Sequence, residues 1–246
     1  MKKLLSHLLT PIFLLVFGFW LLLFHPIQYL CLKIGGRYAH DYSVAVLNFL
    51  LIHTGKILGT SYKLEGAENL ISHRPLLIVT NHQSMYDVPP FFWTLRALHP
   101  KFVTKKELGK GIPSISFNLK YGGSVLIDRK DGKQAISEIH KLADYVNSQG
   151  FTAVIFPEGT RSRNGELKPF KTAGLISLME KMPEALIVPI TINNSYKMLP
   201  YGKYPLGLGV QVSHTIHPAI ENKGDHKELA AKIEAVIASK LEKSVQ

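Results

Sequence analysis

The N-terminal stretch constrains the fold of this chain most strongly, because residues 4–32 contain no Asp, Glu, Lys or Arg. Within it, residues 12–24 are almost wholly apolar. A stretch of this length and composition belongs in or on a lipid bilayer. A cleaved secretory signal would end in small residues, whereas Phe24, His25 and Pro26 stand at the end of the apolar run. We therefore expect residues 1–61 to form an uncleaved, membrane-associated helical segment.

A second apolar run, residues 44–52, can form a helix that packs beside the first. Lys2 and Lys3 precede the first run, and Lys33 and Arg37 follow it. Because basic residues flank both ends, the positive-inside rule gives no orientation. The pattern favours a helical hairpin or an interfacial helix pair, with a single transmembrane anchor as the alternative.

The rest of the chain, residues 62–246, alternates between two periodicities. Short β-branched and apolar runs predict strands, and apolar residues at helical spacing predict helices between them. The predicted strands cover residues 76–80, 102–104, 124–127, 152–156, 186–192 and 210–216, and two amphipathic helices cover residues 135–146 and 229–241. Asp225, with Glu228 three residues later, resembles a capping box at the start of the last helix. This alternation predicts an α/β domain whose sheet is mostly parallel and flanked by helices, without fixing the strand order.

Polar side chains follow the strand at residues 76–80, where functional residues of parallel sheets concentrate. The segment Asn-His-Gln-Ser-Met-Tyr-Asp contains His82 and Asp87. Histidine titrates near neutrality, and a carboxylate beside it can fix its tautomer and stabilise the imidazolium. On an ideal helix this spacing would separate the two side chains by roughly 140°. The pair therefore predicts a general base at an irregular strand-to-helix junction.

Other enzyme classes lack their usual residues in this chain. It contains no Gly-x-Ser-x-Gly elbow, phosphate-binding P-loop, dinucleotide fingerprint or His-Glu-x-x-His motif. The single cysteine, Cys31, lies in the apolar N-terminal stretch, which argues against a thiol nucleophile and excludes an intramolecular disulfide. What remains is a base that would activate a hydroxyl group of its substrate.

Four blocks in order give the chain a resemblance to a known family. They are Asn81-His82 with Asp87, residues 123–129 ending in Asp128-Arg129, residues 156–162 (Phe-Pro-Glu-Gly-Thr-Arg-Ser), and Pro189 within residues 187–190. A Lys-Lys-Glu-Leu segment at residues 105–108 is a further match. In this combination the chain resembles the bacterial lysophosphatidate (1-acyl-glycerol-3-phosphate) acyltransferases of the glycerolipid acyltransferase family. Two mild departures, Val125-Leu126 and Ala173-Gly174, replace no chemically active group.

The resemblance implies transfer of a fatty acyl group from acyl-carrier protein or coenzyme A to the sn-2 hydroxyl of lysophosphatidate, which makes phosphatidate. His82 would take the hydroxyl proton and Asp87 would orient His82. No metal or redox cofactor is implied.

The residues of the third block have chemistry that suits a phosphate. In Glu158-Gly159-Thr160-Arg161 the glycine permits close backbone approach, and the guanidinium group offers a fork for two phosphate oxygens. Arg129 and Lys105 each follow a predicted strand and would reach the same sheet edge if those strands are neighbours. We therefore expect these six residues to form the phosphate-binding site.

Several alternatives stay open. Glu158 can instead hold its loop by pairing with an arginine, Asn81 can cap a helix, and Pro189 can belong to a core strand. The same chemistry could serve another acceptor, such as glycerol 3-phosphate or a lyso-aminolipid. Outside enzymes, the chain could be a membrane lipid-binding protein whose polar blocks are structural.

The net charge of +11 bounds the partners. It suits an anionic membrane, an acidic carrier protein or nucleic acid. Nucleic acid is disfavoured, because the basic residues are dispersed and no nucleic-acid-binding motif accompanies them. We therefore expect lysophosphatidate, a thioester carrier and an anionic membrane as partners. We place the protein at the cytoplasmic (inner) membrane with its catalytic domain facing the cytoplasm.

Overall fold

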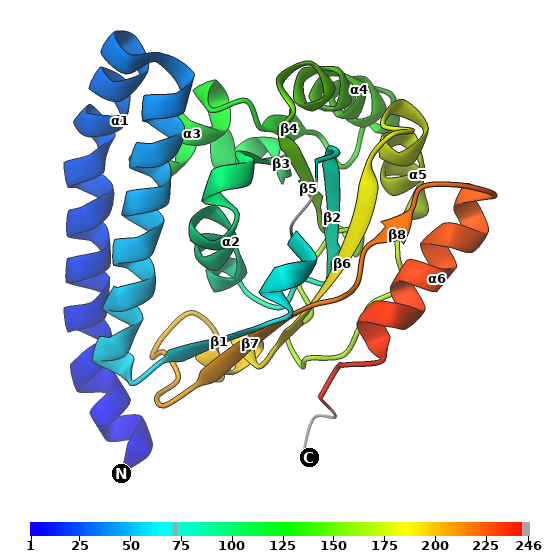
Figure 1. The fold of residues 1–246 in the computed structure, drawn as a ribbon. Helices are drawn as coiled ribbons and strands as arrows, with labels where there is room; N and C mark the ends of the chain where they lie inside the picture. The colour runs from blue at the N-terminus through cyan, green and yellow to red at the C-terminus, as the bar shows by residue number, and fades with distance from the viewer. Residues whose placement is uncertain (71–72, 243–246) are drawn as a thin grey trace.

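A sheet with the strand order β1-β7-β6-β2-β5-β3-β4 forms the centre of the computed structural model, which describes residues 1–70 and 73–242 (Figure 1). An eighth strand, β8, pairs with β6. The strands are β1 (Ser61–Glu65), β2 (Leu76–Thr80), β3 (Pro100–Lys105), β4 (Val125–Ile127), β5 (Thr152–Ile155), β6 (Leu186–Asn193), β7 (Gln211–Ile216) and β8 (Ile220–Glu221). All six predicted strands are present, within a residue or two at most boundaries.

The sheet is mostly parallel, as predicted. Strands β6, β2, β5, β3 and β4 run parallel to one another, and only β7 and β8 pair with β6 in the antiparallel sense. β1 and β8 were not predicted, because β1 is almost wholly exposed and β8 has two residues. Because the central strands are parallel, the loops that follow β2, β5, β3 and β4 leave the sheet at one edge.

Helices cover both faces of this sheet (Figure 1). They are α2 (Val88–Thr94), α3 (Ile115–Tyr121), α4 (Gly132–Gln149), α5 (Thr172–Lys181) and α6 (His226–Ala238), in addition to the N-terminal α1 (Lys2–Thr54). α4 and α6 confirm the two predicted amphipathic helices. The Asp225 carboxylate caps α6 by accepting hydrogen bonds from the N–H groups of Lys227 and Glu228.

Two apolar cores lie on opposite faces of the sheet. Leu77 and Val79 of β2 belong to a core with α4, α5 and α6, whereas Leu76 and Ile78 belong to a core on the other face that includes Phe13 of α1. Side chains alternate along a strand, so a strand covered on both faces must be apolar throughout. This explains the apolar run at residues 76–79 of β2, whose five residues are all buried.

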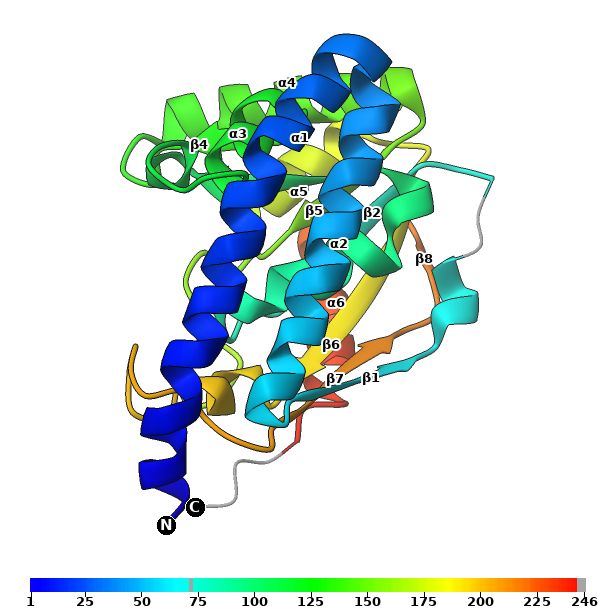
Figure 2. The same cartoon turned by 90° about the vertical axis from the view of Figure 1, so that its left-hand side faces the viewer.

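The N-terminal segment is a helical hairpin. Gly36 has φ 69° and ψ −160°, which breaks the helix into two arms that run antiparallel side by side in Figures 1 and 2. Leu21 and Phe24 of the first arm share a buried cluster with Leu47 and Leu51 of the second. The pairing expected of the two apolar runs is therefore present.

The outer surface of the first arm is apolar. Side chains with more than half of their surface exposed include Leu4, Leu8, Leu15, Phe19 and Leu22. By length and composition this helix is sufficient to cross a membrane. Toward the rest of the protein, Ser6 donates a hydrogen bond to the Leu206 carbonyl, and Thr10 Oγ1 accepts one from the Leu206 N–H at 3.0 Å. The division into residues 1–61 and 62–246 stays a prediction.

Candidate active site

The predicted base and its carboxylate meet directly after β2. His82 Nδ1 donates a hydrogen bond to Asp87 Oδ2 at 2.8 Å, across a short 3-10 helix, η3 (Met85–Asp87). The Asp87 side chain is fully buried, while 12% of the His82 side chain is exposed. The irregular strand-to-helix junction is therefore present. Because Nδ1 is engaged by the carboxylate, Nε2 is the nitrogen that can accept a proton.

The Asp87 carboxylate accepts further hydrogen bonds besides the one from His82. Its Oδ2 also accepts the backbone N–H groups of Gln83 at 2.7 Å and Ser84 at 2.9 Å, and its Oδ1 accepts the hydroxyl of Ser195. Burial alone would raise the pKa of Asp87, but the hydrogen bonds from His82, Ser195 and Ser84 hold that pKa below its usual value. The carboxylate therefore stays charged beside the imidazole.

Ser195 is a site residue that the sequence analysis missed. It opens the 3-10 helix η6 (Ser195–Met198), directly beyond the carboxyl end of β6, and lies 108 residues from Asp87 in the chain. Its position after a predicted strand was the only available signal. β6 lies next to β2 in the sheet, which brings this serine to the catalytic pair.

The loop after β5 is fastened to His82 by Glu158. Glu158 Oε1 accepts the His82 backbone N–H at 2.6 Å, and Oε2 accepts the Lys168 N–H at 3.0 Å. Burial raises the pKa of Glu158 to about 7, against the opposing effect of these two hydrogen bonds. Backbone amides, rather than an arginine, therefore occupy both oxygens. We expect Glu158 to act on a substrate through the loop that it holds.

The tip of this loop turns tightly at Gly159. Its φ is +67°, a region that side chains other than glycine disfavour, and its N–H donates to the Phe156 carbonyl at 3.0 Å. Lys168 Nζ then bonds Thr160 Oγ1 at 3.3 Å and the Arg161 carbonyl at 2.7 Å. The predicted Gly159-Thr160-Arg161 segment is thus a closed, cross-braced turn beside the base.

Two arginines follow strands at this edge, Arg161 after β5 and Arg129 after β4. Partial burial lowers the pKa of both Arg161 and Arg129, and the charge of Arg161 lowers that of Arg129 further. Arg161 also interacts with the Asp87 carboxylate, which opposes the lowering. Positive charge is therefore concentrated at this edge, where the charge of Arg163 also lowers the pKa of Arg161. This charge would stabilise a bound dianion, which is the electrostatic character of a phosphate site.

Lys105 lies at the same edge but has a partner. It ends β3, whose parallel neighbour β4 leads to Arg129, as the phosphate-site prediction required. Lys105 Nζ lies 3.3 Å from Glu107 Oε1, and both side chains are about half exposed. The structure therefore places His82, Arg161, Lys105 and Arg129 at the carboxyl edge of β2, β5, β3 and β4, with Arg129 after the outermost of these strands.

The fold and this site define an acyltransferase domain. The sequence profile of the acyltransferase family matches residues 61–193, more than half of the chain. That range holds His82, Asp87, Arg129 and Arg161. The chain belongs to this family, as the sequence resemblance indicated.

The descriptions of individual relatives are more specific than the description of the family. The chain is 30% identical over 185 residues to the 1-acyl-sn-glycerol-3-phosphate acyltransferase of Saccharomyces cerevisiae, covering 72% of this chain and 58% of that protein. It is 40% identical over 126 residues to the enzyme of the same description from Helicobacter pylori, covering half of each. For the human alpha enzyme the identity is 27%, covering 71% of this chain and 60% of the relative. The chain thus spans at most about 60% of these relatives.

A solved structure is similar over nearly the whole chain. It is the crystal structure of the 1-acyl-sn-glycerophosphate (LPA) acyltransferase, PlsC, from Thermotoga maritima, with a TM-score of 0.79 and 25% sequence identity. The similarity covers 98% of this chain and 97% of that one. It therefore includes the N-terminal hairpin as well as the sheet.

Proposed function

We propose that this protein transfers a fatty acyl group from acyl-carrier protein or acyl-coenzyme A to the sn-2 hydroxyl of 1-acyl-glycerol 3-phosphate, giving phosphatidate. The observation that carries the proposal is the hydrogen bond from His82 to Asp87 at the sheet edge that also carries Arg161 and Arg129. A base for a hydroxyl and a receptor for a phosphate are thereby adjacent. The descriptions of the relatives support the same reaction.

The reaction needs only proton transfer and exchange of one acyl bond. His82 Nε2 removes the proton as the hydroxyl oxygen attacks the thioester carbonyl carbon. The tetrahedral intermediate then expels the carrier sulfur, which takes the proton back from the imidazolium. The buried Asp87 carboxylate stabilises the imidazolium between these steps. No group changes oxidation state, so the proposal includes no redox cofactor, and none of these proposed steps uses a metal ion.

The acceptor phosphate would bind to Arg161 and Arg129. Each guanidinium can donate two parallel hydrogen bonds to phosphate oxygens. Lys105 would add a third positive charge if the ligand draws it away from Glu107. Gly159 and Thr160 shape the turn that presents Arg161, and Glu158 fixes that turn to His82.

The hairpin would place this site at a membrane surface. Tyr86, the residue before Asp87, packs against Phe13 and Phe17 of α1, with ring centroids 5.9 Å and 6.1 Å apart. The catalytic turn therefore rests on a helix whose far side is exposed and apolar. A lysophospholipid could then reach His82 without moving its acyl chain through water, which would cost roughly 0.8 kcal/mol per methylene.

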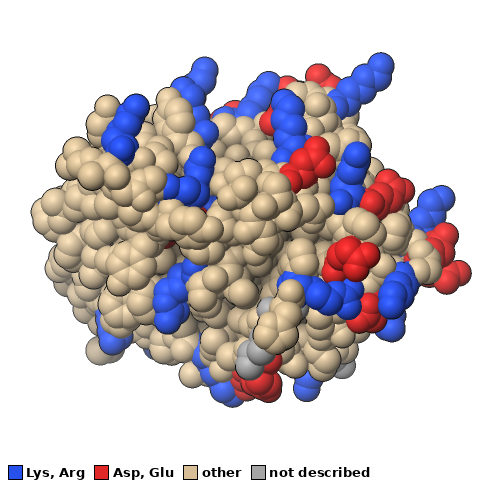
Figure 3. All heavy atoms as spheres, turned by 45° about the horizontal axis from the view of Figure 1, so that its top comes forward, with Lys and Arg blue, Asp and Glu red and all other residues tan. Residues whose placement is uncertain are grey.

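Charge supports an anionic membrane as the partner. On the face shown in Figure 3, Lys and Arg side chains on the left, the side of α1, stand almost without acidic neighbours, whereas most Asp and Glu lie to the right. An anionic leaflet attracts such a surface. We propose that the domain faces the cytoplasm at the inner membrane, where soluble acyl donors are available.

The test is an acyl-transfer assay of the purified full-length protein in mixed micelles. Lysophosphatidate is offered with acyl-carrier protein or coenzyme A thioesters, and glycerol 3-phosphate and a lyso-aminolipid are offered in parallel with the same donors. We expect phosphatidate from the wild type and none above background from a folded His82→Ala variant. Turnover confined to another acceptor would reassign the substrate. No turnover with any pair would favour a non-catalytic lipid-binding protein.

A further inference from the structure

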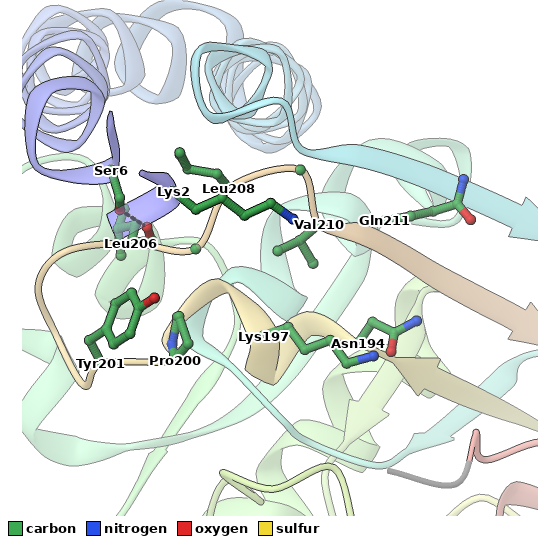
Figure 4. Close-up of a pocket in the computed structure, with 12 residues that line it drawn as sticks. Lys2, Ser6, Asn194, Lys197, Pro200, Tyr201, Leu206, Leu208, Val210 and Gln211 are labelled. Atoms are coloured by element: carbon green, nitrogen blue, oxygen red, sulfur yellow. Dashed lines mark hydrogen bonds between the residues drawn. The ribbon is translucent and has the colours of Figure 1, made fainter. Parts of the chain in front are cut away.

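A second polar cavity lies where the start of α1 meets residues 194–211. It has a volume of about 390 Å³, and Figure 4 shows side chains from α1, η6 and the start of β7 around it. Lys2 and Ser6 line it from α1, Asn194 and Lys197 from the end of β6 and η6, and Gln211 from β7. Neither His82 nor Asp87 belongs to its lining.

The walls of this cavity are fastened together. Ser6 bonds the Leu206 carbonyl, which ties α1 to the loop that precedes β7. The next residue of that loop, Gly207, donates its N–H to the Met198 carbonyl at 2.9 Å, which ties the loop to η6. A Cβ on Gly207 would lie 2.1 Å from the Lys197 carbonyl oxygen, so only glycine allows this close approach. The cavity is therefore formed before any ligand arrives.

The lining is suited to an anion. None of its twelve residues is acidic, and within residues 1–70 and 73–242 neither Lys2 nor Lys197 forms an ion pair. Gln211 adds an amide group to the two ammonium groups, whereas the Asn194 amide donates to Glu242 Oε2, outside the lining, at 2.9 Å. Lys3, one residue on, directs its Nζ to the Tyr201 ring at 5.1 Å from the centroid. A phosphate group can accept hydrogen bonds from the two ammonium groups and from the Gln211 amide.

The surface beside the cavity is apolar. Leu4, Leu5 and Leu8, on the same turns of α1 as Lys2 and Ser6, have 70%, 49% and 64% of their surface exposed. A lipid could place its phosphate in the polar cavity and its hydrocarbon chain along these apolar leucines. We propose that this cavity binds the phosphate headgroup of an anionic phospholipid of the surrounding bilayer, at a site separate from Arg161.

This placement gives a bound lipid a route to the catalytic pair. Lys197 lies in η6, and Ser195 at the start of η6 donates its hydroxyl to Asp87. An occupant that orders η6 would therefore support the Asp87 carboxylate from behind. The proposal does not depend on which acceptor the enzyme uses.

The test compares two lysines that line the cavity with an exposed lysine near it. Lys2→Gln and Lys197→Gln remove the lining charges, and Lys203→Gln is the matched control, because Lys203 lies outside the lining. Binding of the full chain to phosphatidylcholine vesicles is measured with and without phosphatidylglycerol. We expect each lining variant to lose about five-fold in affinity for the anionic vesicles. The control should lose much less, and binding to pure phosphatidylcholine should not change.

Three results would overturn the proposal. An equal loss in all three variants, at unchanged melting temperature, would mean diffuse electrostatic attraction. Competition by inorganic phosphate as effective as that by a short-chain phosphatidylglycerol would mean that the site takes a soluble phosphate. A raised KM for the acyl donor in the lining variants, with unchanged vesicle binding, would assign the cavity to the phosphate of the donor carrier.

Discussion

The backbone N–H of His82 donates to Glu158 Oε1 at 2.6 Å, and the backbone carbonyl of His82 accepts the Ser162 N–H at 2.7 Å. The loop that carries Arg161 is therefore hydrogen-bonded at two points to the main chain of His82. Any shift of this loop moves the base and the phosphate clamp together. Base and clamp act as one rigid unit, which is what positioning a hydroxyl near a thioester requires.

Glu158 should make stability depend on pH. Burial raises its pKa from 4.5 to about 7, so the folded state holds a proton that the unfolded state has released. The stability that this proton contributes is fully present below the unfolded-state pKa and is lost as the pH rises through the folded-state pKa. The wild type should lose more stability than Glu158→Gln between pH 4.5 and about 7. Thermal melting of both proteins across this range is the measurement, and parallel curves would contradict the assignment.

Asp87→Asn should remove the negative charge at this position while it preserves the hydrogen bonds around the side chain. The amide oxygen can replace Oδ2 as acceptor for His82, Gln83 and Ser84, and the amide nitrogen can donate to Ser195. The fold should therefore survive, while the imidazolium loses its counter-charge. We expect a fall in kcat on the order of a hundred- to ten-thousand-fold, as for loss of the base itself in His82→Ala.

Asp87→Ala is the contrasting variant. It leaves the buried hydroxyl and the two N–H groups without an acceptor, so its melting temperature should fall, whereas that of Asp87→Asn should stay near the wild type. Near-normal turnover of Asp87→Asn would mean that the carboxylate serves only as a cap of η3.

Arg161→Lys should weaken binding of the acceptor lysophosphatidate rather than binding of the acyl donor. A point charge replaces a planar fork, so the KM for lysophosphatidate should rise by roughly ten-fold while the KM for the acyl donor changes little. Arg163→Lys is the matched control, because Arg163 is an arginine of the same loop that is not assigned to the phosphate site. Initial-rate kinetics with each substrate varied in turn provide the measurement. A raised donor KM with an unchanged acceptor KM would move the clamp to the carrier phosphate.

The parts of the molecule that the sequence predicted are those whose geometry depends on a single continuous segment of the chain. His82 and Asp87 lie in one strand-to-helix segment, so their approach depends only on local geometry. Ser195 reaches Asp87 through the order of β6 and β2, which periodicity does not encode. Lys101 is a similar case: it has the composition of a surface residue, yet it is 2% exposed and bonds Asp41 of the hairpin at 2.6 Å. Contacts between distant segments depend on the assembled sheet.

The turn of the hairpin should depend on glycine. Gly36 has φ 69° and ψ −160°, a region that is essentially restricted to glycine, and a Cβ added there would meet nothing within 4 Å. Gly36→Ala should therefore destabilise the protein by backbone strain alone, at a cost of about 1–3 kcal/mol. Gly18→Ala is the control, because Gly18 is helical with open space around its Cα, so alanine there should be neutral or stabilising. Equal melting temperatures for the two variants would mean that the turn lies elsewhere.

The hairpin also predicts where the N-terminus lies relative to a membrane. Ser6 and Thr10 are bonded to Leu206 of the sheet domain, so the start of α1 and the domain should face the same side. In a Cys31→Ser background, Lys3→Cys and Lys223→Cys should react with an impermeant maleimide from one side of a sealed vesicle. Ile34→Cys, at the 84% exposed position beside the turn, should be protected by lipid. Labelling of Lys3→Cys only from the side opposite to Lys223→Cys would replace the hairpin by a single spanning helix.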